Sequence, residues 1–189
     1  GLKERAVKST GITLFAQGIK LILQIGSIAI LARLLVPSDF GLVAMVTVFT
    51  GLALQLMEGG LSMATIQRDQ ITHAQISNLF WVNSALGIVF FLLGVSISPL
   101  VAIIYDEPRL TMIMAAMSLT FLIGGLSVQH DALLRRQMRF RAISVIDILS
   151  MAAGIISSIV SAFAGLHYWA LVIGPLVTFL TKTILRWVT

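Results

Sequence analysis

A single lysine lies near the middle of a long apolar stretch. Lys20 interrupts an otherwise uncharged run from Ser9 to Ala32, which is long enough to cross a bilayer as a helix. A charge that faces lipid at the bilayer centre is unfavourable by roughly 3 kcal/mol, so such a lysine usually faces protein or water. At helical spacing, the amides of Gln17 and Gln24 share a face with Lys20. Three bulky polar groups so close together predict a water-accessible cavity.

An ion pair is the competing explanation for Lys20. Two acids, Glu58 and Asp147, lie within or beside other apolar runs and could supply the carboxylate. Both acids are expected nearer the ends of their helices than the bilayer midplane, where we expect Lys20. The cavity is therefore the preferred interpretation, and the ion pair is the alternative.

Charged residues of both signs gather at one predicted membrane surface. The acids are Glu58, Asp131 and Asp147, and the basic residues expected beside them are Arg68, Arg135, Arg136, Arg139 and Arg141. We expect ion pairs between these acids and the loop arginines. The same belt could act as a gate, or could bind the phosphates of anionic membrane lipids, whose geometry clustered guanidinium groups fit. The sequence does not separate these roles.

Catalytic and metal chemistry find little support. The three histidines, His73, His130 and His167, fall in different predicted loops without metal-ligand spacing. The chain has no cysteine, and we find no nucleophile triad, nucleotide fingerprint or phosphate-binding loop. We therefore expect a protein that is not an enzyme and that uses no metal or cofactor.

The elements that must position these groups are membrane helices. Hydrophobic residues make up 58% of the 189 residues, charged residues make up 11%, and the mean hydropathy is +0.99. Soluble domains have about 25% charged residues, so these values indicate an integral membrane protein. Six apolar runs follow one another, at residues 9–35, 41–58, 75–104, 109–130, 143–166 and 168–187. The expected fold is all-α, with six transmembrane helices in a single bundle over residues 1–189.

Small and hydroxylated residues form stripes along the last two runs. Gly154 and Ser158 share one helical face, and Gly174 and Thr178 share another. Small residues at this spacing let helix backbones approach closely, so the stripes favour helix packing over ligand binding.

Basic residues between the runs predict the orientation of the chain. With six crossings, ten basic residues fall on one side of the membrane, and only Arg33 and Arg109 fall on the other. Loops rich in lysine and arginine stay in the cytoplasm, so both termini and the 135–141 loop are expected there. No nucleic-acid-binding motif accompanies these basic residues, and we expect no nucleic acid as a partner.

Four segments carry a more specific pattern. They are LARLLVPSDFG at residues 31–41, GLSMATIQ at 60–67, YDEPRL at 105–110 and ALLRRQMRF at 132–140. In their order and their positions between helices, they resemble the N-terminal six-helix lobe of polysaccharide flippases of the multidrug/oligosaccharidyl-lipid/polysaccharide superfamily. The resemblance covers nearly the whole chain.

The resemblance implies a bacterial inner-membrane transporter. Such a protein moves an undecaprenyl-diphosphate-linked oligosaccharide from the cytoplasmic to the outer leaflet, for cell-envelope or exopolysaccharide biosynthesis. Family members have two six-helix lobes around a cationic cavity and work by alternating access. Lys20 matches their basic cavity residues, with Gln17 and Gln24 as hydrogen-bonding neighbours, and Gln55 and Asp147 would add to the cavity if their faces converge. The expected partners are the lipid-linked oligosaccharide, membrane lipids and a second lobe, from the same longer chain or from another copy.

Other functions are open at this point. A drug or small-solute cation antiporter of the same superfamily would need an acid embedded in the membrane, whereas the acids here are expected near helix ends. A non-transporting scaffold subunit of a polysaccharide export complex would use its polar stripes only for assembly. A membrane-bound transferase would need clustered acids and larger loops than these.

Overall fold

The computed structural model of the chain is helical throughout its described part. Its backbone is described for residues 2–67, 73–137 and 139–189, and the surroundings of its side chains for residues 14–56, 77–128, 130–137 and 139–189. The helices are α1 (Leu2–Leu34), α2 (Pro37–Gln67), α3 (His73–Ile104), α4 (Arg109–Arg136), α5 (Phe140–Phe163) and α6 (Trp169–Val188). Each contains a stretch long and apolar enough to cross a membrane. The prediction of an all-α fold with six membrane helices is confirmed.

Three helices extend six or more residues beyond the predicted runs, and α1 does so at its start, at Leu2 instead of residue 9. α2 extends to Gln67 and α4 extends to Arg136, although the apolar runs end at residues 58 and 130. Hydropathy marks only the part of a helix that suits lipid, whereas the backbone hydrogen bonds of the helix continue into the polar region.

Short turns connect the helices at the end opposite the two termini. After α3, the N–H of Glu107 donates a hydrogen bond to the carbonyl oxygen of Ala102 at 2.9 Å. This bond is typical of a helix end at which the second residue after the helix has a positive φ, and Asp106 (φ 52) occupies that position after Ile104. Gly165 (φ 75) plays the same part after α5. Pro108 then leads into α4, where its missing N–H would have had no partner within the helix.

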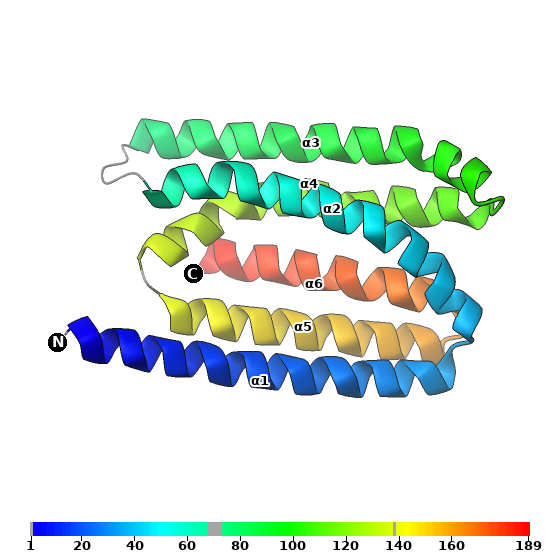
Figure 1. The fold of residues 1–189 in the computed structure, drawn as a ribbon, viewed down its shortest axis with the longest axis horizontal. Helices are drawn as coiled ribbons and strands as arrows, with labels where there is room; N and C mark the ends of the chain where they lie inside the picture. The colour runs from blue at the N-terminus through cyan, green and yellow to red at the C-terminus, as the bar shows by residue number, and fades with distance from the viewer. Residues whose placement is uncertain (1, 68–72, 138) are drawn as a thin grey trace.

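α4 is the most enclosed membrane helix. Its neighbours bury 56% of its apolar stretch, compared with 11% of the apolar stretch of α1. α3 packs along α4, and α6 packs along α5. α1 packs on α5, and α2 packs mainly on α4. Figure 1 shows α1 at one edge of the bundle and α3 at the other. Both termini lie toward the same end, which we call the terminal end; α1, α3 and α5 begin there, and α2, α4 and α6 end there.

Glycines set the close approach of the paired helices. A Cβ added at Gly154 would lie 2.7 Å from the carbonyl oxygen of Gly174, and one added at Gly174 would lie 3.1 Å from that of Gly154. The hydroxyl of Thr178 donates to the Gly174 carbonyl at 2.9 Å. α3 and α4 approach in the same way at Gly87 and Gly125. The packing predicted for the small-residue stripes of α5 and α6 is therefore confirmed.

Candidate functional site

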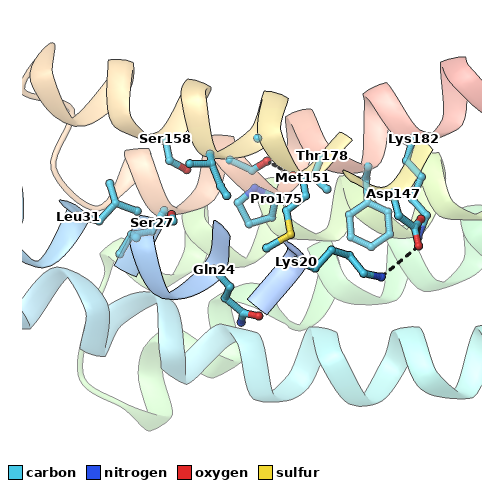
Figure 2. Close-up of a pocket in the computed structure, with 15 residues that line it drawn as sticks. Lys20, Gln24, Ser27, Leu31, Asp147, Met151, Ser158, Pro175, Thr178 and Lys182 are labelled. Atoms are coloured by element: carbon cyan, nitrogen blue, oxygen red, sulfur yellow. Dashed lines mark hydrogen bonds and ion pairs between the residues drawn. The ribbon is translucent and has the colours of Figure 1, made fainter. Parts of the chain in front are cut away.

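A pocket of about 480 Å³ lies between α1, α5 and α6. This volume is within the range of pockets that hold small molecules. The charged residues Lys20, Asp147 and Lys182 line it toward the terminal end, as Figure 2 shows. Uncharged polar groups continue along the wall, supplied by Gln24, Ser27, Ser158 and Thr178. The pocket thus offers charge at one end and hydrogen-bonding groups along its length.

One carboxylate lies between two ammonium groups in this pocket. The Nζ of Lys20 is 3.4 Å from Oδ2 of Asp147, and the Nζ of Lys182 is 3.3 Å from Oδ1. Each carboxylate oxygen therefore faces a different lysine, one from α1 and one from α6. The exposed fractions of the three side chains are 25%, 18% and 30% for Lys20, Asp147 and Lys182, so the described helices do not fully enclose the group. Two ammonium groups against one carboxylate leave an excess of positive charge.

Lys20 pairs with a carboxylate toward one end of α5. Its partner Asp147 lies about two turns after Phe140, the first residue of α5, so the pair is near the terminal end of the membrane helices. Lys20 itself lies close to the middle of α1, which runs from Leu2 to Leu34, and its position at the bilayer midplane stays a prediction. The alternative interpretation, an ion pair between Lys20 and Asp147, is confirmed, and this pair itself lines a pocket.

Arg186 connects the pocket to the end of α4. Its Nη2 lies 2.7 Å from Oδ1 of Asp131 and 4.0 Å from Oδ1 of Asp147, and its side chain is only 6% exposed. Arg135 donates from its Nε to Oδ2 of Asp131 at 2.8 Å. A buried guanidinium needs such partners, because an unpaired buried charge strongly destabilises a protein. Alternating charges therefore run from Lys20 through Asp147, Arg186 and Asp131 to Arg135.

The pairing of acids with loop arginines is found at one of the predicted acids. Asp131 contacts Arg135, one turn further along α4. The same prediction is wrong for Asp147, whose closest described cations are Lys20 and Lys182, because α1 and α6 bring those lysines to either side of α5.

The other residues of the predicted belt are spread over the terminal end. Arg139 donates to the carbonyl oxygen of Thr189 at 3.0 Å, Arg141 is exposed, and Arg136 is half-buried at the end of α4. The side chain of Glu58 and the whole of Arg68 lie outside the described residues. A role of the belt in gating or in binding lipid headgroups stays a prediction.

The predicted cavity residues separate into two groups. Gln24 lines the pocket with Lys20, whereas Gln17 and Gln55 are exposed and lie outside its lining. On α1, the pocket extends from Lys20 toward Gln24, away from the terminal end. Gln17 precedes Lys20 in the helix and therefore lies outside the pocket lining. α2 faces a different, mostly apolar groove of about 510 Å³, which Thr47 lines. α2 and Asp147 therefore do not share the pocket, and the condition under which Gln55 would add to the cavity is not met.

Two cations of the site were not predicted as site residues. Lys182 and Arg186 lie inside the last apolar run, but their sequence positions suit topology signals equally well. The available signal was their spacing of one turn, which puts both on one face of α6. Recognising Asp147 as their common neighbour requires the packing of α6 on α5.

His130 lies on α4, beyond its apolar stretch. Its ring stacks on that of Trp187, with 5.0 Å between centroids, and meets the edge of Phe80. Burial, followed by the positive charge of Arg186, lowers the pKa of His130 below its ordinary value. The described part of the chain holds no group of three or more histidines or acids that could bind a metal ion.

Several known proteins are similar to this chain in sequence. The sequence profile of a family described as polysaccharide biosynthesis protein matches residues 30–189. The lipopolysaccharide biosynthesis protein WzxC of Escherichia coli is 28% identical over 98% of this chain and 37% of its own length. The teichuronic acid biosynthesis protein TuaB of Bacillus subtilis is 31% identical over 88% of the chain and 34% of its length. The succinoglycan biosynthesis transport protein ExoT of Rhizobium meliloti is 29% identical over 77% and 29%.

These matches confirm the resemblance noted in the sequence. The chain spans between 29% and 37% of the length of the three relatives, so it corresponds to a part of each. No solved structure matches the chain. The family profile covers most of the residues, including Asp147 and Lys182 of the pocket. This multi-pass membrane chain belongs to the polysaccharide biosynthesis protein family.

Proposed function

We propose that the chain is one lobe of a bacterial inner-membrane transporter that translocates a diphosphate-linked lipid oligosaccharide by alternating access. The observation that carries this proposal is the pocket between α1, α5 and α6, where Lys20 and Lys182 supply an excess of positive charge within membrane-length helices. Charged side chains among membrane helices are rare and usually serve a pathway or a ligand.

The chemistry of such a substrate matches the two parts of the pocket. A diphosphate carries negative charge that cannot enter hydrocarbon unpaired, and Lys20 and Lys182 would neutralise it. The attached sugars carry hydroxyl groups, for which Gln24, Ser158 and Thr178 offer hydrogen bonds. A polar head group could thus lie along the pocket from its charged end.

The outer face of α1 suits the lipid part of the substrate. Ile22, Ile25 and Ile28 are 72%, 66% and 53% exposed, and they lie on the same helix as Lys20. An apolar surface beside a polar pocket lets an acyl chain stay in the bilayer while its head group enters the protein.

A second lobe is part of the proposal. The relatives are much longer than the chain, so they hold further residues that could form such a lobe. Transporters of two lobes expose a shared site alternately by rocking one lobe against the other. With both termini in the cytoplasm, as the basic residues predict, the charged end of the pocket would face the leaflet where the substrate is made.

One observation bears on the cation antiporter. Asp147 lies in a membrane helix and lines the pocket, as that function would require. Lysines lie within 3.4 Å of both of its oxygens, however, and they would repel an incoming cation. The site therefore favours an anionic ligand.

Complementation of a strain that lacks the protein tests the proposal. Lys20→Ala should abolish or sharply reduce surface polysaccharide at unchanged membrane levels, and Lys20→Arg should retain part of it because the charge persists. Arg33→Ala is the matched control, since it removes an exposed positive charge from the far end of α1, outside the pocket. Full activity of Lys20→Ala would overturn the transport proposal and favour the scaffold.

A further inference from the structure

Asp147 already occupies the position that an anionic ligand of the pocket would need. Its two oxygens face Lys20 and Lys182, and these are the pocket's two ammonium groups. A phosphate oxygen that approached either lysine would compete with this carboxylate for the same donor. Figure 2 shows Asp147 at the charged end, between the helices that carry the two lysines.

We propose that Asp147 is an internal counter-anion, which an anionic head group must displace from Lys20 and Lys182 to bind. This inference rests on the proposed function, because it concerns the regulation of the same site. It assigns the carboxylate a role opposite to that of a ligand-binding residue: Asp147 weakens the binding of anions and lowers the positive charge of the pocket until a ligand arrives.

The contacts of the carboxylate are suited to exchange. Its separations from the lysines are 3.4 Å and 3.3 Å, longer than the 2.7–2.9 Å typical of the strongest charge-assisted hydrogen bonds. All three side chains are partly exposed, so the described helices leave room for a ligand to reach the two lysines. A phosphate oxygen could approach each ammonium group more closely than Asp147 does.

Arg186 offers the displaced carboxylate a second cation. It lies 4.0 Å from Oδ1 of Asp147, and it is held in place by Asp131 at 2.7 Å. Since Asp131 also pairs with Arg135, the described network contains four cations and only two carboxylates. When a ligand engages the two lysines, Asp147 would therefore not be left as an unpaired charge among the helices.

Displacement would also loosen α1. The pair of Lys20 with Asp147 ties α1 to α5 near the terminal end. Toward the other end, Leu31 and Leu35 hold α1 through a small apolar cluster with Ala162 and Ala170. Loss of the polar tie would leave α1 held, within the described part of the chain, by apolar contacts alone, among them that cluster. Binding of the head group would thus be coupled to movement of the first helix.

Binding of inorganic pyrophosphate to the purified protein that carries this chain tests the inference. Asp147→Asn should bind pyrophosphate about tenfold more tightly than wild type, because two partly exposed ion pairs no longer need to be broken. Glu107→Gln is the matched control, since it makes the same change of charge at a carboxylate that pairs with Arg109 outside the pocket, and it leaves both lysine contacts of Asp147 in place. It should change the affinity less than twofold.

The outcomes distinguish the two proposals. Equal or weaker binding by Asp147→Asn, or the same gain in Glu107→Gln, would overturn the counter-anion while leaving the pocket a binding site. Absence of pyrophosphate binding in wild type and in Asp147→Asn would overturn the anion-binding function as well.

A second measurement does not depend on the stability of the Asp147 variant. Spin labels on cysteines introduced at the exposed positions Leu21 of α1 and Leu149 of α5 report the separation of these helices. In the otherwise wild-type protein, saturating pyrophosphate should shift the distance distribution between the labels. An unchanged distribution at saturation would overturn displacement of the carboxylate.

Discussion

α5 and α6 cross closely at Gly154, which lines the pocket. Substitution of this glycine by alanine should lower the stability of the protein. In Gly154→Ala, the new Cβ would lie 2.7 Å from the carbonyl oxygen of Gly174. Because the contacted atom belongs to the backbone, the rotation of a side chain cannot relieve this contact. The two helices must therefore move apart. Such overpacking costs about 1–3 kcal/mol, and the better helix propensity of alanine returns up to about 1 kcal/mol. We expect a net loss of stability of about 1–2 kcal/mol.

The assay is the unfolding midpoint of the purified protein in detergent. Gly26→Ala is the matched control, because a Cβ at Gly26 of α1 meets nothing within 4 Å. The same chemical change should leave the midpoint of this variant unchanged or raise it, since only helix propensity acts. A Gly154→Ala protein as stable as wild type would refute the close crossing of α5 and α6.

Three further predictions concern topology, access and pH. A thiol reagent that cannot cross membranes should label cysteines at Arg136 and at Thr189 only from the cytoplasm; labelling of either from outside would contradict the orientation. A cysteine at position 20 should react with a small hydrophilic thiol reagent, whereas one at the lipid-facing Ile22 should not, and equal reactivity would argue against a wet pocket. Because burial lowers the pKa of His130 in the folded protein, its contribution to stability should be complete above the unfolded pKa of about 6.5 and should decline as the pH falls below it. The midpoint of unfolding, measured from pH 8 to pH 5, should show this decline in wild type and a smaller one in His130→Phe.

The number and order of the helices follow from the sequence. Each apolar run is long enough to span a bilayer, and residues such as Asp106 and Pro108 mark the turns between runs. The ends of α2 and α4 could not be placed this way, since hydropathy falls at the membrane surface while the helical hydrogen bonds continue.

The site was only partly predictable. Lys20 stands out because a charge in an apolar run demands an explanation. Its partner Asp147 is 127 residues away in sequence, and only the packing of α1 on α5 brings the two together. The faces of Gln17 and Gln55 depend on how each helix is rotated about its axis, which the contacts with neighbouring helices determine and a single sequence does not.

Translocation in reconstituted vesicles tests the central claim most directly. The protein that carries this chain would be placed in liposomes with a fluorescent diphosphate-linked lipid oligosaccharide, and the fraction that becomes accessible in the opposite leaflet would be measured over time. We predict that the combined Lys20→Ala and Lys182→Ala variant loses translocation while its helical content and unfolding midpoint stay close to those of wild type. Translocation by that variant at the wild-type rate would contradict the assignment of the pocket between α1, α5 and α6 as the site of the head group.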